Sequence, residues 1–288
     1  MIQQRLSRRD FLKHSTALAA GVTVLSPAGL LAADAARKTK IPIGVQLYSV
    51  RQDCQKDLPG TLNAISKIGY KAVEFAGYYG RDAKTLRKLL DDAGLKCCGT
   101  HTALDTILPE KLAATIEFNK TLGNKYLIVP SMPAKYSKTR EGWENAANLF
   151  NEASDKARSQ GMIVGYHTHT AEFQPIDGEM PFDIFFGRAK KEVVIQFDTG
   201  NAGNLGVDPR VYLKKYPGRT ASIHAKPYSK KNRNALIGQD DLVWPEIFNL
   251  CETSAGTEWY IVEYERDNEP PLVSIEKLHK ILCEMSKC

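Results

Sequence analysis

The sequence lacks the cysteine spacings of a redox or zinc-binding motif. Six cysteines occur in 288 residues, and none forms a C-x-x-C pair or a zinc-finger pattern. Cys97 and Cys98 are adjacent in a predicted strand, so their side chains should point to opposite faces and serve packing. An oxidising compartment would permit a bridge between Cys283 and Cys288, but their spacing alone does not predict one.

A strong excess of charge is also missing. The formal net charge is +6, of which residues 1–35 contribute two positive charges and the remainder about four. No basic helix stripe interleaved with aromatic residues occurs, so we expect no nucleic-acid partner. With 43% hydrophobic and 25% charged residues, the composition is typical of a soluble globular enzyme.

No apolar run is long enough to predict a membrane span. The stretch from Ala17 to Leu31 is shorter than the ~20 residues that a transmembrane helix needs, and it is rich in alanine, glycine and threonine. Arg8 and Arg9 precede it, and residues 33–35 offer a small-x-small cleavage site. This arrangement resembles a bacterial twin-arginine export signal, although an uncleaved amphipathic helix is the alternative. We therefore predict a signal peptide over 1–35, a linker over 36–40, a periplasmic or otherwise exported protein, and no stable membrane insertion after export.

The chain has no glycine-rich turn after its first predicted strand, which disfavours an open nucleotide-binding sheet. From residue 41 onward, apolar runs that predict strands alternate with helical periodicity, and glycines such as Gly69, Gly94 and Gly123 end the helices. Strands are expected at 41–48, 71–75, 95–99, 126–129, 162–165, 193–197, 221–223 and 259–262. Eight such units in about 250 residues predict one α/β domain, a (β/α)8 TIM barrel over 41–288. A doubly wound open sheet is the alternative.

Metal-binding residue types stand where the last four predicted strands end. The ends carry His167 with His169, then Asp198, then His224 with Lys226, then Glu263 with Glu265. A parallel barrel presents its chemistry at the carboxyl ends of its strands, and residues two apart in a strand share a face. A single such histidine is more often a hydrogen-bonded core residue, and a single aspartate is often a helix N-cap. Their repetition over successive strands favours a metal site.

These segments together resemble the sugar phosphate isomerase/epimerase family of xylose-isomerase-like barrels, over about residues 41–286. The resemblance rests on residues 43–51, 72–75, 165–169, 197–201, 223–226 and 262–263. In that family, Glu, Asp, His and Glu from strands five to eight hold one divalent metal. Matching by segment implies the metal ligands His167, Asp198, His224 and Glu263. Two imidazoles and two carboxylates suit Mn²⁺, Co²⁺, Fe²⁺ or Zn²⁺.

His167 departs from the family pattern, which has a glutamate at this position. The family's epimerases use two metal-bound carboxylates to remove and return a proton, and a metal-bound imidazole cannot act as a base through the same nitrogen. His169 or Glu172 would then supply the missing base, and which of His167 and His169 binds the metal stays open. The His-x-His pattern resembles the inosose dehydratase branch of the family.

The resemblance implies removal of a proton next to a sugar carbonyl through an enediolate. The candidate catalytic residues are Glu263, His169, Glu172, Lys226 and His101, and Tyr48 and Glu74 are expected to line the sugar pocket. For Lys226, an ion pair at the barrel mouth is the alternative. A basic loop that includes Lys230, Lys231 and Arg233 indicates either an anionic substrate or a solvated surface.

We expect a divalent-metal-dependent isomerase or epimerase that acts on a sugar or keto-sugar. The alternative is a dehydratase or lyase that acts on an inosose or a 3-keto-glycoside by β-elimination. An apurinic endonuclease and a non-catalytic carbohydrate-binding barrel are further alternatives. The oligomeric state is left open.

Overall fold

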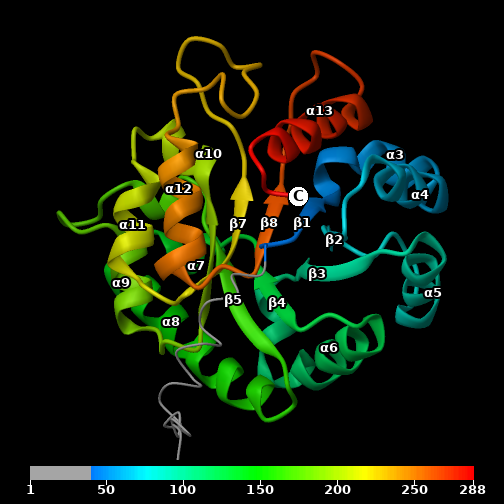
Figure 1. Ribbon diagram of the computed structural model, residues 1–288. Coiled ribbons are helices and arrows are strands. Elements are labelled where there is room, and N and C mark those ends of the chain that lie inside the picture. Colours follow the sequence, from blue (N-terminus) through cyan, green and yellow to red (C-terminus); the bar gives the residue numbers. More distant parts are fainter. Residues whose placement is uncertain (1–39) are drawn as a thin grey trace, which may run out of the picture. The chain divides into compact units, whose positions relative to one another are not determined.

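Eight parallel strands close into a barrel in the computed structural model, which describes residues 40–288 (Figure 1). The strands are β1 Ile43–Gln46, β2 Ala72–Phe75, β3 Lys96–His101, β4 Tyr126–Val129, β5 Ile163–His167, β6 Val194–Asp198, β7 Thr220–Ala225 and β8 Trp259–Val262. Each strand pairs with the next, and β1 pairs with β8 to complete the ring. The predicted (β/α)8 barrel is therefore confirmed. The predicted signal peptide, and all of the linker except Lys40, lie outside the described residues.

Helices connect the strands and surround the barrel (Figure 1). They are α3 Arg51–Lys56, α4 Leu58–Ile68, α5 Ala83–Ala93, α6 Pro109–Leu122, α7 Ala134–Ser137, α8 Arg140–Arg158, α9 Pro181–Arg188, α10 Thr199–Asn204, α11 Pro209–Lys215, α12 Trp244–Leu250 and α13 Pro271–Glu284. Short 3-10 turns are η1 Leu47–Val50, η2 Leu104–Ile107 and η3 Ala171–Phe173, and the wider turn η4 Cys251–Ala255 continues α12. Within residues 40–288, no helix combines the length and the apolar character that crossing a membrane requires.

The helix boundaries follow local chemistry. The Asp82 side chain accepts a hydrogen bond of 3.0 Å from the backbone N–H of Thr85 and so caps the start of α5. Gly94 ends the same helix with a φ of 67°, in the left-handed region that glycine adopts without a steric penalty. Gly69 and Gly123 end α4 and α6 in the same way, as the sequence predicts.

Two hydrophobic layers fill the molecule, one inside the barrel and one between the barrel and the helices. Cys98 belongs to the interior layer with Ala72 and Ile261, whereas its neighbour Cys97 belongs to the outer core. The prediction that these cysteines pack on opposite faces is therefore confirmed. The bridge that the sequence leaves open, between Cys283 and Cys288, is present.

The first strand is shorter than predicted. It ends at Gln46 because the side-chain oxygen of Gln46 accepts a hydrogen bond of 3.0 Å from the backbone N–H of Tyr48, which starts η1. Tyr48 therefore lies in η1 and not in β1, so its side chain is not part of the strand's alternation between interior and outer faces. The short helix α10, which the sequence analysis does not predict, begins directly after β6 because Asp198 Oδ1 accepts a bond of 2.7 Å from the backbone N–H of Asn201.

Candidate metal centre and active site

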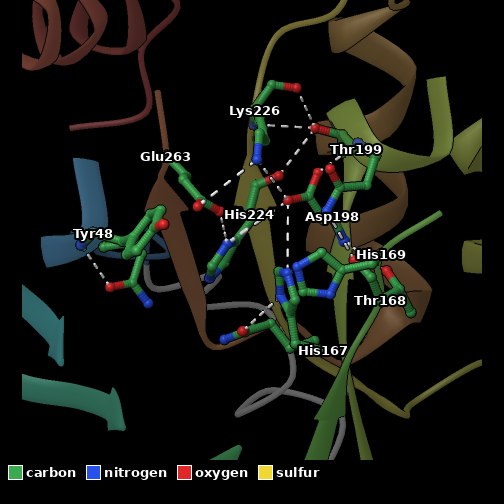
Figure 2. A network of polar contacts seen from close by, with 12 residues as sticks. Tyr48, His167, Thr168, His169, Asp198, Thr199, His224, Lys226 and Glu263 are labelled. Carbon is green, nitrogen blue, oxygen red and sulfur yellow. Dashed lines mark hydrogen bonds and ion pairs between the residues drawn. The ribbon is translucent and has the colours of Figure 1, made fainter. Parts of the chain in front are cut away.

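Four side chains from adjacent strands converge at the carboxyl ends of β5 to β8. His167 and Asp198 are the last residues of β5 and β6, His224 lies in β7, and Glu263 follows β8 directly. One ligand atom from each lies within 4.8 Å of the ligand atoms of the others, and all four side chains are buried. Figure 2 shows these groups pointing toward one another. The barrel therefore brings together the four residues implied as metal ligands, which we call the ligand group.

The atoms that face the centre of this group are identified by their distances. Asp198 Oδ2 lies 3.8 Å from His167 Nε2 and 3.9 Å from His224 Nδ1, and His224 Nδ1 lies 2.5 Å from Glu263 Oε2. Within residues 40–288, Asp198 Oδ2 is buried and accepts no hydrogen bond, although the other oxygen of this carboxylate caps α10. A buried carboxylate oxygen without a donor is costly. Its position between two imidazoles fits a divalent cation, and the donor set suits Mn²⁺, Co²⁺, Fe²⁺ or Zn²⁺.

A second layer of hydrogen bonds lies behind the two imidazoles. His224 Nε2 is 2.7 Å from Glu74 Oε2, and His167 Nδ1 is 2.9 Å from Gln196 Oε1. Because these oxygens accept, the histidine nitrogens that contact them carry the protons. The opposite nitrogens, His224 Nδ1 and His167 Nε2, therefore face the centre of the ligand group, which is how outer partners orient metal-binding imidazoles.

Glu74 has a different position from the one expected of a sugar-binding residue. It is fully buried behind His224, and Gln46 and Gln196 donate hydrogen bonds of 2.8 and 2.7 Å to its two oxygens. The structure thus places Glu74 as a positioning residue for His224. Gln46 and Gln196 are not among the site residues predicted from the sequence. The available signal was that Gln196 stands two residues before Asp198, on the same face of an otherwise apolar strand.

His101 is brought to the site as well. Its Nε2 donates to Gln196 Oε1 at 2.7 Å, and its ring stacks on that of His224 with centroids 5.5 Å apart. Gln196 Oε1 therefore accepts from both His101 and His167. This shared acceptor holds His101 beside the ligand group, where it stays a candidate for proton transfer.

The two candidates for the missing base differ in their surroundings. His169 is exposed, and its ring meets that of His167 edge-on with centroids 4.6 Å apart. Glu172 is buried, and its two oxygens accept from the Tyr166 hydroxyl and from the backbone N–H of His169. Burial raises the pKa of Glu172 despite these bonds. Glu172 therefore holds the turn after β5, whereas His169 lies free at the barrel mouth. Of the two histidines, His167 is the member of the ligand group.

Lys226 forms the ion pairs that were the alternative to a catalytic role, which stays a prediction. Its Nζ lies 3.7 Å from Glu263 Oε1 and 3.8 Å from Asp198 Oδ2 (Figure 2), and 2.6 Å from Glu265. Burial opposes its charge, but the surrounding carboxylates outweigh that effect and raise the pKa of Lys226 above its ordinary value. It is therefore an ammonium donor and not a base.

Tyr48 lies at the mouth, where its side chain is 42% exposed and the Arg51 guanidinium stands 4.2 Å from its ring centroid. This exposure leaves an aromatic face open to solvent at the entrance of the barrel. The expected contact between Tyr48 and a sugar stays a prediction.

The buried charges shift the ionisation of the ligand group. Burial opposes protonation of His224, but Glu263 and Glu74, on its two sides, outweigh burial and raise its pKa to about 10. Burial raises the pKa of Asp198 to about 6, although the positive charge of the neighbouring Lys226 lowers it in part. Without a metal, His224 therefore carries a proton on Nδ1, the nitrogen that faces the ligand group.

Comparison with known proteins agrees with this architecture. The model of the xylose isomerase-like TIM barrel family matches residues 62–285. The chain belongs to this family. An inosose dehydratase of Clostridium botulinum is 27% identical over 272 residues, which cover 79% of this chain and 91% of that protein. This family member is therefore an enzyme of the isomerase/epimerase or dehydratase type.

Two solved structures of sugar phosphate isomerase/epimerase proteins from Parabacteroides distasonis are similar. One is 27% identical with a TM-score of 0.73, and covers 84% of this chain and 98% of its own. The other is 23% identical with a TM-score of 0.75, and covers 86% and 97%. The likeness at 23% identity shows the same fold.

Substitution of the ligand group in this xylose isomerase-like barrel should abolish metal binding. We expect Asp198→Ala and His224→Ala to lower the bound metal from about one equivalent to less than about one tenth, because each removes a central ligand. Elemental analysis after dialysis measures this. The matched control is Asp92→Ala, which alters an exposed aspartate outside the ligand group. Full metal occupancy in Asp198→Ala and His224→Ala would contradict the assignment.

Metal binding should also release a proton. Because His224 is protonated below a pKa of about 10 and must be neutral to bind a metal, the apparent affinity should rise roughly tenfold per pH unit near neutrality. Titration calorimetry in two buffers of different ionisation enthalpy measures the released proton. An affinity that does not change between about pH 6.5 and pH 8.5 would be incompatible with a proton on Nδ1.

Proposed function

We propose that this protein is a metal-dependent dehydratase or lyase that removes a proton next to the ketone of a cyclic keto-sugar or inosose and expels a β-oxygen substituent. The observation that carries the proposal is the presence of His167 in the ligand group, at the position where the family resemblance implies a glutamate. Asp198 uses Oδ1 to cap α10 and directs Oδ2 between the two imidazoles, so Glu263, whose Oε1 faces Lys226, is the carboxylate assigned as the base. A site with one available base suits elimination, which removes a proton without returning it to the opposite face.

The residues can be assigned to steps of this elimination. Glu263 takes the proton from the carbon next to the ketone, and the electron pair of that C–H bond forms the enediolate. The enediolate then forms a carbon–carbon double bond as the C–O bond to the β-substituent breaks. The leaving oxygen takes a proton from the Lys226 ammonium at the mouth. Desolvation lowers the pKa of His169 to about 4, so this imidazole is neutral near pH 7 and does not serve as the acid. A divalent ion held by the ligand group would act as a Lewis acid on the ketone oxygen and lower the pKa of the neighbouring C–H.

The charges near Glu263 keep it in the ionised form that a proton acceptor needs. Burial opposes ionisation of Glu263, but His224 and Lys226 outweigh it and hold the pKa of this carboxyl well below its usual range. Glu263 is therefore ionised over the whole working pH range. Lys226, 3.7 Å from Glu263 Oε1, is also placed to donate a hydrogen bond to an enediolate oxygen.

An isomerase or epimerase is the second candidate. It is supported by the similarity to the sugar phosphate isomerase/epimerase at 27% identity. In that case neutral His169, whose ring lies against His167 at the mouth, would act as the second base, and the Lys226 ammonium would return a proton. Elimination and isomerisation share the first proton removal and differ only in the fate of the enediolate.

The remaining alternatives have less support. An apurinic endonuclease of this fold needs a three-metal cluster. Among residues 40–288, the groups that could bind metal are the ligand group, a set of His101, His167 and His224 that overlaps it, and a set of His279, Cys283 and Cys288. The two cysteines of the last set form a disulfide. A non-catalytic carbohydrate-binding barrel would not need an orphaned buried carboxylate oxygen.

Proton exchange tests the function directly. Metal-loaded protein incubated in D₂O with inososes, ketoses and 3-keto-glucosides should incorporate deuterium next to the ketone or release water or the aglycone. Glu263→Gln should slow this by roughly 10²–10⁴-fold, because a catalytic base is lost. Glu276→Gln, which changes an exposed glutamate of α13, is the matched control and should retain full activity. Absence of exchange and of elimination with every keto-substrate, while metal is bound, would refute the proposed chemistry.

We propose in addition that residues 1–35 direct export. Support comes from Arg8 and Arg9 before the apolar stretch and from the small residues at 33–35. The double substitution Arg8→Lys with Arg9→Lys should keep the full-length chain in the bacterial cytoplasm, whereas Lys13→Gln should not. Cell fractionation with mass measurement of the processed chain gives the answer. Equal export of the double variant would remove the twin-arginine assignment.

A further inference from the structure

A polar pocket adjoins the ligand group on the side of Lys226. Its volume is about 450 Å³, and the residues around it include Asn201, Lys226, Lys230, Arg233, Glu265 and Arg266. They come from the segments that follow β6, β7 and β8. Figure 1 shows the segment between β7 and α12, coloured yellow to orange, extending beyond the arrowhead of β7. A pocket of this size accommodates part of a small molecule.

Lys226 connects the pocket to the ligand group. Its Nζ contacts Glu265, which lines the pocket, and lies within 4 Å of Asp198 and Glu263, which belong to the ligand group. Gly200, next to Asn201, permits this approach, because a Cβ there would lie 2.7 Å from Lys226 Cγ. A substrate bound at the ligand group would therefore have one side directed past Lys226 into the pocket.

The pocket carries positive charge that the protein does not neutralise. In the part of the chain that the structure describes, no carboxylate lies within ion-pair distance of Lys230, Arg233 or Arg266. Glu265 is paired with Lys226 at 2.6 Å. Three basic side chains that line one pocket and have no acidic partner attract an anion.

Two acidic residues of the loop after β7, Asp240 and Asp241, are engaged in hydrogen bonds within that loop. Asp240 accepts from the backbone N–H of Tyr228 at 3.1 Å and from Trp244 Nε1 at 2.8 Å. Asp241 accepts from the backbone N–H of Lys230 at 2.8 Å. Arg266 donates its Nε–H to the Arg233 carbonyl at 2.7 Å, which joins the segments after β7 and β8. These bonds fix the loop in the position that places its basic side chains around the pocket.

We propose that this pocket binds an anionic substituent of the substrate, a carboxylate or a phosphate, so that the substrate class is an anionic keto-sugar. The inference rests on the proposed function for the position of the ketone at the ligand group. Arg233 and Arg266 each offer a planar guanidinium that matches the paired oxygens of such an anion. Lys226 lies between the ketone and the anionic substituent.

Binding measurements test the pocket without requiring turnover. The probes are glucuronate and glucose 6-phosphate, compared with neutral glucose, by calorimetry on the metal-loaded full chain. We expect at least one anion to bind roughly tenfold or more tightly than glucose, and its affinity to fall when salt is raised from about 50 mM to about 500 mM. Which anion binds identifies carboxylate or phosphate as the preferred group.

Matched variants locate the binding. Arg233→Gln and Arg266→Gln should each weaken the anion roughly tenfold and leave glucose unchanged, because a charge-assisted hydrogen bond is lost. Lys231→Gln removes the same charge from an exposed neighbour that is not among the lining residues, and should have no effect. Two results would overturn the inference. One is that neither anion binds more tightly than glucose, and the other is that Lys231→Gln weakens binding as much as the arginine variants.

The outcome for the pocket is separable from the outcome for the reaction. Tight anion binding that depends on Arg233 and Arg266, without deuterium exchange in any anionic keto-sugar, would retain the pocket and reject the proposed chemistry. Deuterium exchange in neutral keto-sugars, together with an affinity for both anions no higher than for glucose, would retain the chemistry and reject the pocket.

Discussion

The structure of the site depends on the balance of buried charge at the carboxyl end of the barrel. Glu74, Asp198 and Glu263 are buried carboxylates, and Lys226 is the ammonium group that faces Asp198 and Glu263. Because Lys226 also pairs with Glu265, this cluster with neutral imidazoles carries an excess of negative charge, which a divalent cation would reduce. Without the metal, His224 takes a proton and bridges Glu263 and Glu74. Buried charges are tolerated only when they are paired in this way.

This balance requires the closed barrel. Glu74 in β2 is separated from His224 in β7 by 150 positions, and Gln196 in β6 reaches Glu74 across the interior. In an open sheet these side chains would lie on distant strands. Closure brings β1 and β2 beside the strands that carry the ligands, so that one half of the barrel supports the metal centre presented by the other half.

The proposed chemistry rests on one feature of the ligand group. His167 stands where the family resemblance implies a glutamate, and Glu263 and the Lys226 ammonium lie beside it. In the proposed function, this arrangement serves loss of a leaving group. The basic pocket beyond Lys226 adds a means of selecting the substrate by charge, and Lys226 belongs to both places.

The sequence by itself predicted the alternation of strands and helices and the metal-binding residue types at the strand ends, because strand ends and period-two alternation are local properties. The number of units favoured a closed barrel over an open sheet, the family resemblance implied the four ligands, and the choice between His167 and His169 stayed open. The sequence did not determine that Glu74 orients His224, that Glu172 holds a turn, or that Gln46 and Gln196 complete the second layer. The sequence also did not predict that β1 ends at Gln46, which places Tyr48 at the mouth of the barrel. Only the tertiary structure decided these points, because each depends on the direction of a side chain toward partners far away in the sequence. The pocket was likewise invisible, since its basic residues come from separate loops that meet only after the barrel has closed.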